Sequence, residues 1–176
     1  MKEQPEKSWE FDITSASEVR GSLEDEFLPV GDIRILTDGS SSPDQNPYRE
    51  DSLFGAHLST FANSIVNILG EDSVRVELDA SDIQFTPIST PDAVRIHVDI
   101  HGVPDELLDS EPDLITTEAF AREVYCTLSN WYEEAYTINP ELTEREWFQD
   151  FEVALGDAER TMKAADIDSD DTPPTG

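Results

Sequence analysis

The chain has 176 residues, and 40 acidic residues against 11 basic ones give it a net charge of −29. Such a charge argues against direct binding to nucleic acid or to an anionic membrane, because each carries charge of the same sign. Three Trp, four Tyr and eight Phe, which recur at regular intervals among aliphatic residues, also argue against a wholly disordered acidic chain.

The first predicted elements are short. Alternation of apolar and polar residues predicts strands over 9–13 and 33–35, each with one buried face. Between them, Ser15 and Glu18 have the spacing of a capping box, which opens a helix that runs to about residue 28. That helix is predicted to bury a stripe of apolar residues spaced four positions apart: Val19, Leu23 and Phe27.

The longest uncharged stretch of the chain predicts a central helix. Residues 38–48 (DGSSSPDQNPY) are turn-forming and predict a loop before it. Over 51–69, apolar residues follow helical spacing, and Gly70 marks the end. No Asp, Glu, Lys or Arg occurs between Asp51 and Glu71. In so acidic a chain, we expect such a helix to be covered on most sides and to lie at the centre of the core.

Three closely spaced strands follow this helix. Apolar and polar residues alternate over 74–79, 83–86 and 94–101, and the turns between these segments are short. This pattern predicts an antiparallel meander with one apolar and one polar face. A loop rich in Asp, Glu and Pro is predicted next, over 103–114.

Two helices are predicted to close the fold. The first covers 116–136 and ends before Asn139–Pro140, and the second opens with Thr143 and Glu146 as a capping box. The short link between them predicts an antiparallel helical hairpin. The whole order of elements predicts an α+β fold: a mainly antiparallel sheet of about five strands, helices packed on one face, and a C-terminal helical hairpin.

The distribution of apolar residues predicts one folded unit. We expect a flexible N-terminus over 1–8, a single α+β domain over 9–165 and a disordered acidic tail over 166–176. The charged first residues do not resemble a signal peptide, and no stretch approaches the about 18 apolar residues that a membrane-spanning helix needs. We therefore expect a soluble cytoplasmic protein.

The even distribution of the negative charge along the chain favours adaptation to high salt. Residues 1–88 hold 18 acidic and 6 basic residues, and residues 89–176 hold 22 and 5. An even acidic coat with few lysines is typical of the cytosolic proteins of halophiles, since concentrated salt shortens the Debye length to about 3 Å at 1 M and screens the repulsion. The alternative is mimicry of nucleic acid, which needs charge gathered on one surface.

A His-x-Asp-x-His pattern on the third strand of the meander is the candidate metal site. His97, Asp99 and His101 fall on the polar face, but the two histidines lie about 13 Å apart along a strand, too far to share an ion. His97 and Asp99 could bind a metal with a third ligand from Glu77 or Asp79. The other interpretation is a solvated sheet face on which the histidine pairs with the aspartate.

Aromatic residues of the two last helices are the candidate partner-binding site. Tyr132, Tyr136 and Trp147 gather around the predicted hairpin turn. Most aromatic residues there should belong to the core, but any of these three that stays exposed would form a partner-binding patch with an acidic rim.

No pattern of catalytic residues is found, and we expect no enzymatic activity and no cofactor. The chain contains neither a G-x-S-x-G nucleophile motif nor a glycine-rich phosphate loop. The leading hypothesis is an acidic protein–protein interaction domain that binds a partner with a basic surface, as an inhibitor or immunity protein would. The alternatives are a metal-dependent hydrolase that uses His97 and Asp99, and a structural or assembly subunit.

Overall fold

The structure is a computed structural model of the whole chain. It describes the following residues: 9–37, 48–52, 57–78, 81–89, 92–100 and 113–167. The predicted flexible N-terminus, most of the predicted loops over 38–48 and 103–114, and the predicted acidic tail from residue 168 lie outside the described residues.

The first sheet contains three antiparallel strands in the order β1-β2-β3. These are β1 (Trp9–Ile13), β2 (Gly31–Thr37) and β3 (Tyr48–Ser52). The 3-10 helix η1 (Ser17–Val19) and the short helix α1 (Arg20–Glu24) connect β1 to β2.

The second sheet contains four antiparallel strands in the order β4-β5-β6-β7. They are β4 (Val74–Glu77), β5 (Ser81–Ile88), β6 (Ala93–Ile100) and β7 (Asp113–Thr116). Val76 lies opposite Ile83, which in turn lies opposite Val98, so the apolar residues of neighbouring strands share one face. The predicted meander with one apolar and one polar face is confirmed.

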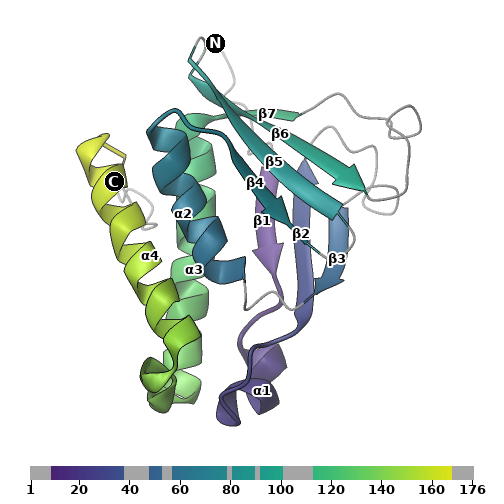
Figure 1. Cartoon of the computed structure of the whole chain (residues 1–176), viewed down its shortest axis with the longest axis vertical. Helices are drawn as coiled ribbons and strands as arrows, with labels where there is room; N and C mark the ends of the chain where they lie inside the picture. The colour runs from purple at the N-terminus through teal and green to yellow at the C-terminus, as the bar shows by residue number, and fades with distance from the viewer. Residues whose placement is uncertain are drawn as a thin grey trace, which may run out of the picture.

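The remaining elements are helical and lie together against the sheets (Figure 1). They are α2 (Leu58–Leu69), α3 (Thr117–Ile138), the 3-10 helix η4 (Pro140–Glu144) and α4 (Glu146–Ala164). Helices α3 and α4 form the predicted C-terminal hairpin, and α2 packs against both of them and against β4 and β5. The α+β class is confirmed.

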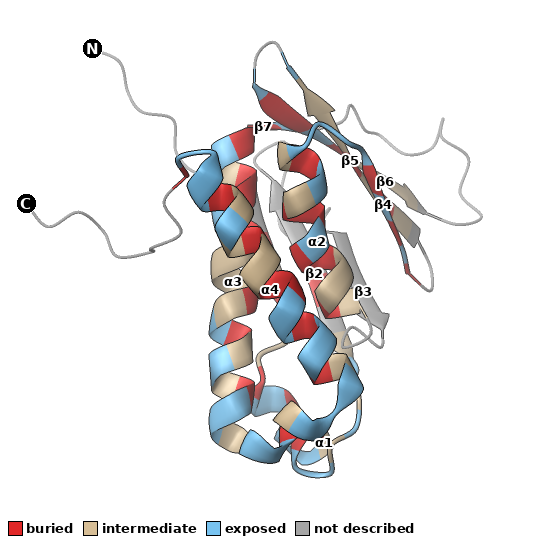
Figure 2. Ribbon diagram, turned by 60° about the vertical axis from the view of Figure 1, so that its left-hand side comes forward, coloured by how far each residue is buried: buried red, intermediate tan, exposed pale blue. Residues whose placement is uncertain are grey.

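One hydrophobic core joins all these layers (Figure 2). Phe11 of β1 contacts Phe61 of α2 with ring centroids 4.9 Å apart. Phe85 of β5 contacts Phe120 of α3 at the same distance. The uncharged helix α2 has six buried residues, which confirms its predicted place within the core: Leu58, Phe61, Ala62, Ser64, Ile65 and Ile68.

The structure corrects several boundaries. The strands form two sheets of three and four strands rather than one of about five. The residues at the start of the predicted helix over 51–69 pair with β2 as part of β3, so α2 begins only at Leu58. The predicted helix that ends near residue 28 is reduced to η1 and α1 and ends at Glu24.

Three helices end in the same type of turn, with an acidic residue in the left-handed conformation that favours glycine. These residues are Glu26 after α1, Glu71 after α2 and Asp166 after α4, with φ of 64°, 69° and 64°. After α4, the Asp166 amide donates to the Lys163 carbonyl at 3.0 Å and the Ile167 amide donates to the Met162 carbonyl at 2.8 Å. This pair of hydrogen bonds defines a Schellman motif.

Helix α3 protects the β1 edge of the first sheet. The Phe11 amide donates to Glu123 Oε2, and the Thr127 hydroxyl donates to the Phe11 carbonyl, both at 3.0 Å. One turn further along, the Trp131 indole donates to the Thr14 carbonyl at 3.0 Å. Side chains spaced four apart on one helix face therefore satisfy backbone groups that a neighbouring strand would otherwise bond, and they close an edge that could pair with another chain.

Candidate functional site

Two segments far apart in the sequence meet at the end of the molecule where α3 turns into α4 (Figure 1). They are residues 17–26, which include η1 and α1, and residues 133–150, which include the end of α3, η4 and the start of α4. We call this surface the hairpin end. It holds ten carboxylates: Glu18, Glu24, Asp25, Glu26, Glu133, Glu134, Glu141, Glu144, Glu146 and Asp150.

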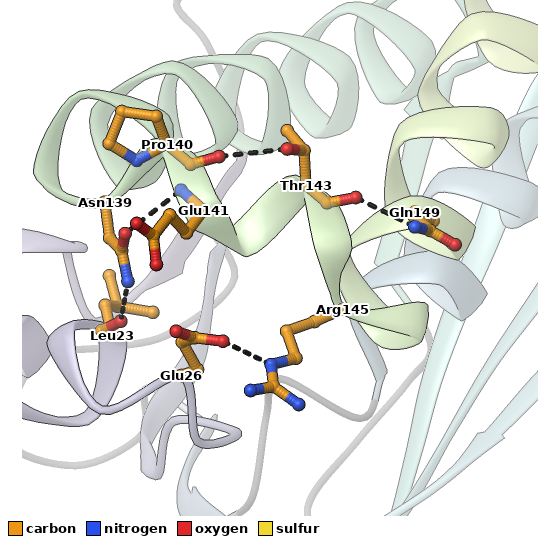
Figure 3. Close-up of polar contacts among 8 residues, drawn as sticks. All are labelled: Leu23, Glu26, Asn139, Pro140, Glu141, Thr143, Arg145 and Gln149. Atoms are coloured by element: carbon orange, nitrogen blue, oxygen red, sulfur yellow. Dashed lines mark hydrogen bonds and ion pairs between the residues drawn. The ribbon is translucent and has the colours of Figure 1, made fainter.

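The two basic residues of the hairpin end are both engaged by its own carboxylates. Arg20 lies 3.7 Å from Glu24 on the exposed face of α1. Arg145 pairs with Glu26 and so joins the start of α4 to the end of α1 (Figure 3). Ten carboxylates and two paired arginines leave this surface with a net charge of −8.

Asn139 fixes the position of α1 relative to the hairpin. Its amide nitrogen donates to the Leu23 carbonyl at 2.9 Å, and its amide oxygen accepts a hydrogen bond from the Glu141 amide at 3.0 Å (Figure 3). One side chain therefore caps the 3-10 helix η4 and also adds a second hydrogen bond to the Leu23 carbonyl, which accepts from the Glu26 amide at 3.0 Å. On the other flank of α3, Ser17 of η1 donates to Glu134.

The connection between α3 and α4 is held by its own hydrogen bonds. The Thr143 hydroxyl donates to the Pro140 carbonyl at 2.9 Å, and the Gln149 side chain donates to the Thr143 carbonyl at 2.8 Å (Figure 3). The predicted capping box of Thr143 and Glu146 is wrong, because Arg145 occupies the N-cap of α4 and makes no side-chain cap hydrogen bond. These hydrogen bonds hold the connection between α3 and α4 in one conformation.

The three aromatic residues predicted to bind a partner differ in exposure. Tyr132 is half-buried and stacks on Phe148, with ring centroids 4.6 Å apart and an angle of 13° between the rings. Trp147 is also half-buried and meets the same phenylalanine edge-on at 5.5 Å. Tyr136 is 46% exposed. Tyr132 and Trp147 thus pack mainly against the hairpin core, and Tyr136 provides the exposed aromatic ring.

Tyr132 also contacts a carboxylate of the facing helix. Burial raises the pKa of Tyr132, and the charge of Glu152 and a hydrogen bond to it raise the pKa further. Burial and Glu159 act in the same direction on the pKa of Tyr125, two turns earlier on α3. The seam between α3 and α4 therefore pairs tyrosine hydroxyls with glutamates.

The loop that follows α1 exposes two large apolar residues, one of which the sequence pattern predicts to be buried. Phe27 is 65% exposed and Val30 is 53% exposed. The predicted burial of Phe27 is wrong, because the helix stops at Glu24 and the left-handed Glu26 changes the direction of the chain before Phe27. Exposed large apolar side chains beside carboxylates are typical of the centre and rim of a binding surface.

The predicted metal residues lie on the outer, polar face of the second sheet. His97 lies opposite Gln84, and Asp99 lies opposite Asp82. Arg75 of β4 reaches both carboxylates, at 2.7 Å from Asp82 and 3.8 Å from Asp99.

No group of three His, Cys, Asp or Glu side chains that could hold a metal ion occurs among the described residues. His101 and Asp79, the other residues of the predicted polar face, lie outside that part of the chain. The metal site at His97 and Asp99 therefore stays a prediction.

Comparisons with known proteins identify no relative. No model of a known protein family matches the chain, and no significant match is found among curated proteins or solved structures. Within the described part of the chain, none of the helices is both long enough and apolar enough to cross a bilayer.

Proposed function

We propose that this chain is an acidic protein–protein interaction domain, and that its hairpin end docks onto a partner with a basic surface. The observation that carries the proposal is the net charge of −8 at the hairpin end. Each of its two arginines is paired with one carboxylate, and the other carboxylates have no arginine partner on this surface. A partner rich in Lys and Arg would be steered to this surface and would find unpaired carboxylates there.

The exposed ring of Tyr136 adds a contact that charge alone does not provide. Tyrosine is enriched among the residues that dominate binding energy, because it buries a large apolar area and retains a polar group. Carboxylates of the hairpin end flank it along α3 and η4. An inhibitor or immunity protein that blocks a basic active site needs such a surface, with negative charge around an apolar anchor.

The same charge favours an environment of concentrated salt. Six of the basic side chains in the described part of the chain form ion pairs with neighbouring carboxylates: Arg20, Arg75, Arg122, Arg145, Arg160 and Lys163. The many remaining carboxylates repel each other at low ionic strength, and salt screens this repulsion. We infer a halophile-like cytoplasm, in which the midpoint of thermal unfolding rises with potassium chloride concentration.

Affinity capture with matched charge variants tests the proposal. The hairpin variant is E133Q/E141Q/E144Q, and the control variant D72N/E77Q/D166N removes the same number of negative charges elsewhere. Each immobilised chain is exposed to a native high-salt extract, and the retained proteins are quantified.

We expect one basic protein at stoichiometric yield on the wild type and on the control variant, and much less of it on the hairpin variant. Equal retention on all three chains would rule out the hairpin end as the docking surface. Absence of a stoichiometric basic protein from the wild-type fraction would contradict the interaction class itself.

A further inference from the structure

A cavity of about 470 Å³ lies where α2 and α4 end and α3 begins. These helix ends lie at the opposite end of the molecule from the hairpin end (Figure 1). The cavity is bordered by the last residues of α2, the end of β5, the first residue of α3 and the C-cap of α4. Its volume falls within the range of pockets that bind small molecules. The lining residues are Ile68, Leu69, Glu71, Pro87, Ile88, Ser89, Asp92, Thr117 and Ala165.

The two charged side chains of this cavity, Glu71 and Asp92, carry carboxylates, which accept hydrogen bonds. The hydroxyl of the buried Thr117 donates its proton to Asp92 Oδ1 at 2.8 Å, so its oxygen presents only lone pairs to the cavity. The second carboxylate oxygen of Asp92 and the exposed Glu71 carboxylate have no partner among the described residues. Lys and Arg are absent from the described lining.

The helix ends around the cavity add to its negative potential. Helices α2 and α4 both end at the cavity, and each C-terminus carries about half an elementary negative charge. The positive N-terminus of α3 also points here, but the Thr116 hydroxyl accepts from the Ala119 amide at 3.1 Å and Asp92 accepts from the Thr117 side chain. That positive end is therefore already occupied by the protein's own acceptors.

Beside the two carboxylates and the hydroxyls of Ser89 and Thr117, the lining side chains are aliphatic, which separates this cavity from a metal site. Ile68, Leu69, Pro87 and Ile88 provide aliphatic surface beside the two carboxylates. A hard divalent cation takes six or more oxygen ligands, and two carboxylates among aliphatic side chains do not provide them. An apolar stem that carries one positive group matches both parts of the lining.

We propose that this cavity binds an organic cation, namely a primary ammonium or guanidinium group on an apolar stem. The stem lies against Ile68 and Ile88, and the charged group lies between Glu71 and Asp92. The same chemistry occurs in free aliphatic amines and in the Lys or Arg side chains of a protein partner. This proposal is independent of the docking surface at the hairpin end.

Binding of defined amines, followed by amide chemical shifts, tests the proposal. The probes are hexylamine, hexanol as an uncharged probe of the same length, and lysine with acetyl and methylamide caps as a model of a protein side chain. Titrations are run at the lowest potassium chloride concentration that gives cooperative unfolding.

We expect saturable amide shifts from hexylamine at residues 68–71, 88, 89 and 117, and much weaker ones from hexanol. If capped lysine shifts the same residues, a protein side chain can supply the cation. If hexylamine binds and capped lysine does not, the ligand is a free amine.

The matched variants are E71Q/D92N in the cavity and E144Q/D150N at the hairpin end, which remove equal charge. Gln and Asn keep the side-chain shapes, and the amide oxygen that D92N introduces can still accept from Thr117. The E71Q/D92N variant should bind hexylamine at least about tenfold more weakly than the wild type, while the E144Q/D150N variant should bind it as the wild type does. Equal weakening in both variants, shifts spread over the whole acidic surface, or hexanol binding as tight as that of hexylamine would overturn the proposal.

Discussion

The substitution Asn139→Asp tests whether one amide group holds α1 onto the helical hairpin. Asp keeps the size and shape of the side chain and can still accept the hydrogen bond from the Glu141 amide, since Asp and Asn are comparable N-cap residues. It loses the amide donor that reaches the Leu23 carbonyl at 2.9 Å. The change therefore removes one of two hydrogen bonds and leaves the other in place.

The expected cost follows from the partly buried position of this contact. Loss of an average hydrogen bond costs about 0.5–1.5 kcal/mol. The Leu23 carbonyl keeps a second hydrogen bond, from the Glu26 amide at 3.0 Å, so the substitution does not leave it without a partner. Water reaches part of the site, and the new carboxylate faces the Leu23 carbonyl oxygen. We expect the free energy of unfolding to fall by about 1.5 kcal/mol, the upper end of the range for one hydrogen bond.

Denaturant unfolding in molar potassium chloride, with Asn130→Asp as the control, measures this cost. Asn130 is exposed on the same helix, so the control makes the same chemical change and adds the same charge away from Leu23. The control should stay within about 0.5 kcal/mol of the wild type, as is usual for exposed positions. Equal losses in the two variants would refute the role assigned to Asn139.

Three further predictions concern the edge of the first sheet, a helix end and the tyrosines of the seam. Thr127→Val removes the hydroxyl that donates to the Phe11 carbonyl of β1 and should lower the free energy of unfolding by about 1 kcal/mol. The control Thr137→Val removes an exposed hydroxyl that bonds only its own helix and should cost much less. Similar costs would exclude edge protection by α3. Asp166→Gly relieves a left-handed residue and removes a negative charge from the end of α4, so the free energy of unfolding should rise by about 0.5–1 kcal/mol, and a loss would contradict the assigned turn. The pKa values of Tyr125 and Tyr132 are raised above 10.0 in the folded chain, so the unfolded chain loses these protons first and the free energy of unfolding should fall as the pH rises above about 10. A Y125F/Y132F variant should lose less stability than the wild type in alkaline unfolding. An unchanged loss would exclude these two tyrosines as its source.

Local patterns in the sequence predict much of the fold. Apolar and polar residues alternate in β1, β4, β5 and β6, and the absence of charge in α2 identifies the buried helix. Strands β3 (YREDS) and β7 (DLIT) show no such alternation, so the pattern predicts neither. The division into two sheets depends on which strands pair, and the sequence pattern of each strand does not specify its neighbour.

The candidate site is harder to predict from the sequence. The excess of carboxylates is evident, but their concentration at the hairpin end depends on α1 packing against α3, which is more than a hundred positions away. Asn139 marks the end of a helix in the sequence, and its second role as a donor to Leu23 requires the tertiary structure. Phe27 fits a helical apolar stripe, and only the left-handed turn at Glu26 makes it exposed.

Hydrogen–deuterium exchange of the chain alone and in complex with the captured basic protein tests the central claim most directly. We predict slower exchange on binding over 17–24 and 133–150, which belong to the hairpin end, and unchanged exchange in β4 and β5. Slower exchange confined to the outer face of the second sheet, around His97 and Asp99, would contradict docking at the hairpin end.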